Sequence, residues 1–233
     1  MTRPPHASSP LPVAILVSGG GTNLQALLEA LHDSSVARVA RVVSSRADAA
    51  ALERAHRAGV PTTVLAEPAS ADEVSAALGD AWLVVLAGYV KRIPPPVVGR
   101  FRWRVINIHP ALLPAFGGPG MYGRRVHAAV LASGAAVSGA TVHYVDEEYD
   151  RGPIIAQWPV PVRSDDTPES LAARVLEAEH RLLPQVVLEL ARRGVPGKPV
   201  RLFAAGSTFV TGDKLAVALE EASDGRTVGP SNR

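Results

Sequence analysis

A short apolar run that ends in a glycine cluster most constrains how this chain can fold. Val13-Ala-Ile-Leu-Val17 is apolar throughout, and Ser18-Gly-Gly-Gly21 follows it directly. Continuous apolar runs of this length are typical of parallel strands that are buried on both faces. Leucines at helical spacing follow in residues 23–32, so the segment predicts a strand, a glycine turn and a helix in succession.

The same alternation continues over the first hundred residues. Further strands are expected at 39–43, 63–65, 82–87 and 105–108, and a helix is expected at 47–58, where Gly59 and Pro61 end it. Alternating strands and helices favour an α/β fold in which helices cover a parallel sheet. We therefore expect a Rossmann-like parallel sheet with flanking helices.

The second half of the chain has a different pattern. Strands are expected at 140–145 and 154–162, joined by an acidic loop, and they predict an antiparallel C-terminal extension of the sheet. A long helix begins at Pro168, and helical periodicity fades after Phe203. We expect a flexible lead over residues 1–10, one domain over 11–203 and a partly disordered tail over 204–233.

Composition excludes several classes of protein. The chain has no cysteine, so disulfides and thiolate metal sites are excluded, and no histidine spacing indicates another metal site. Its net charge of +2 gives no reason to expect a nucleic-acid partner. No apolar run approaches the ~20 residues of a membrane span, and no secretory signal is visible. We expect a cytoplasmic protein with neither a membrane nor a nucleic-acid partner.

The glycine cluster predicts a phosphate site. Glycines let the backbone approach an anion, and the following helix offers free N–H groups, so Gly21, Thr22 and Asn23 are the expected ligands. A dinucleotide site would need a third glycine where Leu24 stands and an acid after the second strand, where residues 42–46 have none. A P-loop lysine is also missing. The pattern favours a monophosphate, although a tight strand-to-helix turn can use glycine without any ligand.

Two polar side chains stand where the fifth expected strand ends. Asn107 and His109 are two residues apart, so they point to one face of the strand. An amide and an imidazole placed together can stabilise a developing oxyanion, but a structural histidine is equally compatible with the pattern. Spacing alone does not choose which acid of the 146–150 loop acts with His109. A carboxylate beside it would raise the imidazole pKa.

The other histidines are interpreted from their context. His143 lies on the strand before the acidic loop, where it either faces the site or has a local structural partner. Four further histidines lack a comparable context and are expected at the surface: His6, His32, His56 and His127.

These motifs together resemble the phosphoribosylglycinamide formyltransferase family over residues 12–201. The matching stretches are Ser18-Gly-Gly-Gly-Thr-Asn-Leu24, Leu86-Ala-Gly-Tyr89, Asn107-Ile-His-Pro-Ala-Leu-Leu-Pro114, Gly139-Ala-Thr-Val-His143, Asp150-Arg-Gly-Pro153 and Glu179-His180. The Asn-x-His and Asp-x-Gly-Pro motifs are specific to folate-dependent formyl transferases and their hydrolase relatives. The glycine loop narrows the resemblance to the glycinamide ribonucleotide enzymes.

The resemblance implies a role for each matching residue. His109 is implied as general acid, Asn107 as the ligand of the formyl oxygen, and Asp150 as the group that raises the His109 pKa and moves protons. Gly21, Thr22, Asn23 and Glu179 are implied to bind the ribonucleotide. The implied folate residues are Val90, Lys91, Arg92, Ile93, Asn107, Val145 and Asp146. The chain departs from the family in having no arginine at 68–78 to contact folate.

The implied activity is transfer of a formyl group from 10-formyltetrahydrofolate, a co-substrate, to the amine of glycinamide ribonucleotide in de novo purine biosynthesis. The partners would be these small molecules, and the enzyme would be a monomer or a homodimer. A formyltetrahydrofolate hydrolase would carry a regulatory domain before Pro12, and a methionyl-tRNA formyltransferase would carry a basic C-terminal domain; neither is expected here. A non-catalytic nucleotide-binding module would lack the Asn-His-Asp set.

The loop at 116–123 is the last candidate element. Four of its eight residues are glycine, and it follows the Asn-His-Pro segment closely. We hypothesise a mobile lid that orders over bound substrates, with Met121 and Tyr122 as its apolar contacts. The alternative is a rigid turn that links His109 to a helix expected from Val126.

Overall fold

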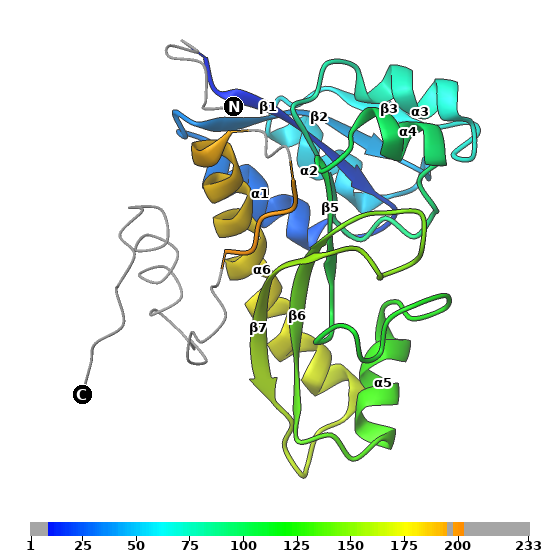
Figure 1. Ribbon diagram of the computed structural model, residues 1–233, viewed down its shortest axis with the longest axis vertical. Helices are drawn as coiled ribbons and strands as arrows, with labels where there is room; N and C mark the ends of the chain where they lie inside the picture. The colour runs from blue at the N-terminus through cyan, green and yellow to red at the C-terminus, as the bar shows by residue number, and fades with distance from the viewer. Residues whose placement is uncertain (1–8, 195–197, 203–233) are drawn as a thin grey trace.

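The computed structural model describes residues 9–194 and 198–202, so residues 1–8 of the expected 1–10 lead and the whole expected tail over 204–233 lie outside the described residues. Its centre is a seven-stranded sheet in the order β3-β2-β1-β4-β5-β6-β7 (Figure 1). The strands are β1 (Leu11–Val17), β2 (Ala37–Ser44), β3 (Thr62–Val64), β4 (Leu83–Leu86), β5 (Val105–His109), β6 (Val137–Tyr144) and β7 (Ile154–Pro161). The helices are α1 (Thr22–Leu31), α2 (Ala50–Arg57), α3 (Ala71–Leu78), α4 (Pro95–Arg100), α5 (Arg124–Ala132) and α6 (Pro168–Arg193).

The sheet has the expected mixed topology. Strands β1 to β5 pair in parallel, whereas β6 pairs antiparallel with both β5 and β7. The Rossmann-like parallel sheet and its antiparallel extension are therefore confirmed. The strand order reverses between β1 and β4, and in open α/β sheets ligands bind at the carboxyl ends of strands beside such a reversal.

The two faces of the sheet bury separate cores. Val13, Ile15 and Val17 face a core shared with α1 and α6, whereas Ala14 and Leu16 face a core shared with α3 and α4. Figure 1 shows α1 and α6 on one side of the sheet and α3 with α4 on the other. All five of these β1 side chains have no exposed surface. Burial on both faces explains why the strand is apolar at every position.

Two helices were not anticipated from the sequence, α3 and α4. The N-terminus of α3 carries a recognisable cap, because the Ser70 hydroxyl accepts a hydrogen bond from the Glu73 amide. The Glu73 carboxylate in turn accepts from the Ala66 and Glu67 amides and fixes the preceding loop. Prolines begin α4, which is only six residues long, so it is too short to show a helical period.

Helix α6 carries site residues as well as core residues. Thr167 and Ser170 form a capping box at its start, and the helix continues unbroken through Pro184 to Arg193. It packs against α1, α5, β6 and β7. Among residues 9–194 and 198–202, no helix combines the length and the apolar character that a membrane crossing requires.

Candidate active site

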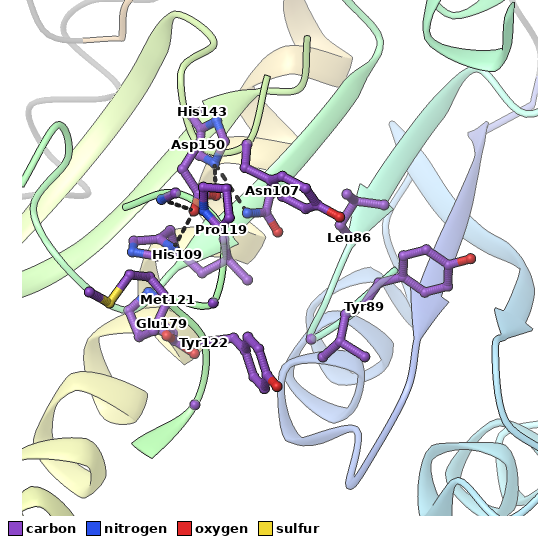
Figure 2. A pocket seen from close by; sticks show the side chains of 18 of the residues that line it. Leu86, Tyr89, Asn107, His109, Pro119, Met121, Tyr122, His143, Asp150 and Glu179 are labelled. Carbon is purple, nitrogen blue, oxygen red and sulfur yellow. Dashed lines mark hydrogen bonds and ion pairs between the residues drawn. The ribbon is translucent and has the colours of Figure 1, made fainter. Parts of the chain in front are cut away.

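A cavity of about 710 Å³ opens where β4 and β5 end. Its walls are the strand ends, the loops at 88–93, 118–123 and 145–150, and the inward face of α6. Figure 2 shows Asn107, His109, His143 and Asp150 gathered in it, with Tyr122 and Glu179 nearby. Most sequence-predicted site residues line this cavity: Asn23, Val90, Lys91, Arg92, Ile93, Asn107, His109, Val145, Asp146, Asp150 and Glu179.

Asn107 on β5 and His143 on β6 are cross-strand partners. The Nδ1 atom of His143 lies 2.8 Å from the Tyr144 carbonyl oxygen and must donate to it. In neutral His143, Nε2 therefore accepts a hydrogen bond, and Asn107 Nδ2 lies 3.1 Å from it as the donor. His143 thus faces the site and fixes the Asn107 amide, leaving the second amide hydrogen for a ligand.

His109 is held between two acceptors. Its Nε2 donates to the Phe116 carbonyl oxygen at 2.9 Å, and its Nδ1 lies 3.5 Å from Asp150 Oδ2. Burial lowers the pKa of His109 below the usual imidazole value, although the Asp150 charge and the Phe116 carbonyl both raise it. Asp150 thus acts on this pKa in the expected direction, but its effect is smaller than that of burial. The reason is that His109 is 3% exposed, and desolvation of the charged imidazole outweighs the attraction.

Of the acidic residues in the 146–150 loop, Asp150 is the one whose carboxylate lies beside His109. Its Oδ2 accepts a hydrogen bond from the Gly118 amide at 2.9 Å, and its Oδ1 lies 3.6 Å from His143 Nε2. Burial raises the pKa of Asp150, but His143, His109 and the Gly118 amide outweigh this effect and leave the pKa below its usual value. Asp150 therefore stays ionised between two imidazoles.

The Asp-x-Gly-Pro motif has a structural explanation. Asp150 has a φ of 56°, in the left-handed region that few non-glycine residues adopt. A Cβ atom on Gly152 would lie 1.8 Å from the Tyr144 carbonyl oxygen. Only glycine lets the loop pass so close to the end of β6, and this path places Asp150 beside His109.

Asn23 and Glu179 meet beside the glycine loop. Asn23 Nδ2 donates to Glu179 Oε2 at 2.6 Å, and Asn23 Oδ1 is buried without a partner among the described residues. Burial raises the pKa of Glu179 to about 7, and the hydrogen bond from Asn23 opposes this effect. Gly21 has a φ of 72° at the start of α1, and no side chain caps this helix. Gly21 and Thr22 lie outside the cavity lining, and Thr22 borders a separate groove between α1 and α6.

The segment after β4 is tied to the loop after β1. The Ser18 hydroxyl accepts a hydrogen bond from the Val90 amide at 3.1 Å and lies 2.7 Å from the Ser45 hydroxyl. Arg92 donates to the Glu147 carbonyl oxygen and thereby joins the 90–93 segment to the acidic loop. Val90 is 49% exposed at the cavity mouth. The expected folate residues all line the cavity, and the Arg92 hydrogen bond joins two of their segments.

His127 corrects one expectation from the sequence. It was expected at the surface, but it is 4% exposed and lines the cavity, and its buried Nδ1 has no hydrogen-bond partner among the described residues. Burial lowers its pKa, and nearby His109 lowers it further. Helical spacing could have revealed this position, because His127 lies three residues before Val130 on the apolar face of α5.

The fold and this cavity define an α/β protein with a cavity of small-ligand size at the carboxyl ends of its strands. The model of the formyl transferase family matches residues 11–187, and the chain belongs to that family. Within the described residues, no group of three or more histidine or acidic side chains has the arrangement of a metal site.

Named relatives narrow the comparison. A chloroplastic phosphoribosylglycinamide formyltransferase of Arabidopsis thaliana is 47% identical over 187 residues, which are 75% of this chain and 63% of that protein. The Haemophilus influenzae phosphoribosylglycinamide formyltransferase is 39% identical, with 75% of this chain and 84% of that protein covered. A solved glycinamide ribonucleotide transformylase of Symbiobacterium toebii superposes with a TM-score of 0.73 at 40% identity, covering 84% of this chain and 95% of that one.

Proposed function

We propose that this protein transfers a formyl group from 10-formyltetrahydrofolate to the amine of glycinamide ribonucleotide. One observation carries the proposal: a single cavity holds the Asn107, His109 and Asp150 cluster together with Asn23 and Glu179, which adjoin the glycine loop. The cavity therefore joins an oxyanion-stabilising group to a place for a phosphorylated substrate. Relatives named for this activity support the choice of substrates.

The two substrates are assigned to different walls. The free amides of Gly21, Thr22 and Asn23 receive the ribonucleotide phosphate, and Glu179 contacts the same substrate. The 90–93 segment and Val145 with Asp146 hold the folate. Both substrates then meet at Asn107 and His109, where the strand ends fix the reacting atoms.

The reaction is an acyl transfer. The amine lone pair forms a bond to the formyl carbon, and the carbonyl π electrons move onto oxygen. The Asn107 amide and the Nε2–H group of His109 stabilise this oxyanion, an effect worth about 3–4 kcal/mol for each donor. Collapse reforms the carbonyl and breaks the bond to the folate nitrogen, which takes up a proton as the attacking nitrogen loses one. Asp150 favours the charged His109 and helps that proton move.

The same proposal covers the setting of the enzyme. It acts in the cytoplasm, as a monomer or a homodimer, on these two small molecules. Formyl folate is consumed as a co-substrate, and the chemistry above uses only side chains of this chain and the two substrates.

An assay of folate absorbance tests the proposal. Purified protein is mixed with 10-formyltetrahydrofolate, with and without glycinamide ribonucleotide, and the appearance of tetrahydrofolate is followed. We expect turnover only when both substrates are present. Turnover without the ribonucleotide would instead establish a hydrolase. Ligand binding without turnover in either mixture would establish a non-catalytic nucleotide-binding module.

A further inference from the structure

The three carbonyl groups of the glycine loop are all held by neighbouring donors. The Gly19 oxygen accepts from the Ala51 amide at 3.0 Å, and the Gly21 oxygen accepts from the Gln25 amide at 2.9 Å. The Gly20 oxygen accepts from Arg54 Nε at 2.8 Å. Two of the three donors are backbone groups, so Arg54 is the one side chain that takes part.

Holding the carbonyls also aims the amides. A trans peptide is planar, and its N–H points opposite to its C=O. The carbonyls of residues 19–21 are directed toward α2 and the first turn of α1, so the amides of Gly20, Gly21 and Thr22 are directed to the opposite side of the loop. None of these three amides has an acceptor among the described residues. Successive free amides of this kind form a concave site for an anion.

Arg54 connects the loop to the helix behind it. Its Nη1 atom donates to Gln25 Oε1 at 3.3 Å while Nε holds Gly20, so one guanidinium bridges the loop and α1. The packing there is tight, since a Cβ atom on Gly21 would lie 2.6 Å from that of Ala51. A charged donor on the Gly20 carbonyl also polarises the peptide whose amide belongs to Gly21, which strengthens that amide as a donor.

We propose that Arg54 is a positioning residue that holds the glycine loop in the conformation that binds the phosphate of the substrate. This inference rests on the proposed function, because it assumes a phosphorylated substrate at the loop. Asn23 supports a ligand beside the loop independently, since its Oδ1 atom is a buried acceptor with no partner among the described residues, suited to a hydroxyl or amine donor of the substrate, and the residue is only 8% exposed. Arg54 acts through the loop, and the guanidinium itself does not contact the substrate.

The test compares Arg54→Ala and Arg54→Lys with the unchanged protein. Calorimetry measures the affinity for glycinamide ribonucleotide, for ribose 5-phosphate and for the folate separately. Loss of a hydrogen bond to a charged group predicts about tenfold weaker binding of both phosphorylated ligands in Arg54→Ala. Folate binding and kcat at saturating ribonucleotide should stay within about twofold. Lysine keeps the positive charge but lacks the forked guanidinium that donates to two acceptors at once. Arg54→Lys should therefore rescue part of the affinity for the phosphorylated ligands.

Arg57→Ala is the matched control. Arg57 lies on the same helix but is exposed, and within the described residues its side chain makes polar contacts with Glu53 alone. We expect its ligand affinities to equal those of the unchanged protein. If Arg54→Ala binds the ribonucleotide as tightly as the unchanged protein does, the role of Arg54 is overturned while the proposed function stays intact. If Arg54→Ala loses as much affinity for the folate as for the ribonucleotide, and its melting temperature falls, Arg54 has a general structural role and the positioning role is overturned as well. Failure of the unchanged protein to bind the ribonucleotide would overturn the proposed function itself.

Discussion

Glu179 Oε2 lies 2.6 Å from Asn23 Nδ2, so α6 and α1 meet at the cavity through residues 156 positions apart. Both side chains are buried, at 7% and 8% exposure. Burial raises the pKa of Glu179 to about 7, which places a titratable carboxyl group beside the proposed phosphate loop.

This contact predicts a pH-dependent affinity for the ribonucleotide. Glu179 ionises as the pH rises through about 7, and a carboxylate accepts hydrogen bonds from a substrate better than the neutral acid does. The KM for the ribonucleotide should therefore fall as the pH rises through about 7. Glu179→Gln should remove the step and raise KM, whereas exposed Glu177→Gln should keep it. A step that survives in Glu179→Gln belongs to another group.

The same carboxyl group affects stability in the opposite sense. Its pKa is raised in the folded state, so between the ordinary value of 4.5 and about 7 the folded chain binds more protons than the unfolded chain. The stabilisation is complete below this window and is lost as the pH rises through it. Relative to Glu179→Gln, the free energy of unfolding of the unchanged protein should fall across the window. Denaturant titrations at several pH values measure the difference, and parallel pH profiles would contradict the burial argument.

His109→Ala should abolish most turnover and leave the fold intact. Loss of a general acid and oxyanion donor predicts a fall in kcat of about 10²–10⁴. Stopped-flow or steady-state folate absorbance measures the rate, and thermal melting checks the fold. Exposed His32 provides a control, since His32→Ala removes an imidazole far from the cavity. Activity of His109→Ala within a few-fold of the unchanged protein, with normal melting, would sink the assignment.

Asp150→Asn should keep substrate binding and lose most turnover. The neutral amide no longer favours the charged imidazole, while burial continues to oppose it, so the pKa of His109 should fall further below its usual value. NMR titration of His109 in both forms measures the change. Glu148→Gln removes a charge from the same loop and should leave the titration unchanged. An unaltered His109 pKa in Asp150→Asn would give Asp150 another role.

The glycine-rich loop contacts both members of the proposed catalytic pair, His109 and Asp150. The Phe116 carbonyl accepts from His109, and the Gly118 amide donates to Asp150. His109 can offer its Nε2 proton to a substrate only after this loop moves, which supports the lid hypothesis. Hydrogen exchange should show amides 117–124 more protected with both ligands bound than in the free protein. Equal protection in the two states would favour the rigid turn.

Substitution within the loop should change the fate of the formyl group. Gly118 and Gly120 have φ values of 105° and 84°, with open space where a Cβ atom would stand. Alanine at both positions would therefore strain the backbone without a steric clash. If closure is impaired, donor hydrolysis should rise relative to transfer, because water reaches the formyl group. An unchanged ratio of hydrolysis to transfer would show that the loop does not exclude water from the site.

Gly152→Ala should lower both activity and melting temperature. The added Cβ atom would lie 1.8 Å from the Tyr144 carbonyl oxygen, so the loop must shift and carry Asp150 away from His109. Gly99→Ala is the control, because nothing lies within 4 Å of its Cβ position in α4. Alanine there should stabilise the protein slightly, by about 0.5–1 kcal/mol. Normal activity of Gly152→Ala would show that the loop can shift where it passes β6 without loss of function.

The sequence by itself determined the fold class and several positions in the site. The apolar run of β1 required a strand covered on both faces, and regular alternation predicted the parallel sheet. Asn107 and His109 were candidate residues because they share one face at a strand end, which follows from the period of two in a strand, and the family motif then implied their roles. These properties are local, so a single stretch of sequence contains them.

The tertiary structure alone decided which distant groups lie together. It selected Asp150 from the acidic loop, turned His143 toward Asn107, and joined Glu179 to Asn23. It also buried His127, and it made the burial of His109 outweigh the attraction of Asp150. Contacts of this kind depend on the path of the chain between the residues, and a pKa depends on the solvent removed from around the group. Neither the contacts nor the pKa can be predicted from one short stretch of sequence, because both arise only when separate segments pack together.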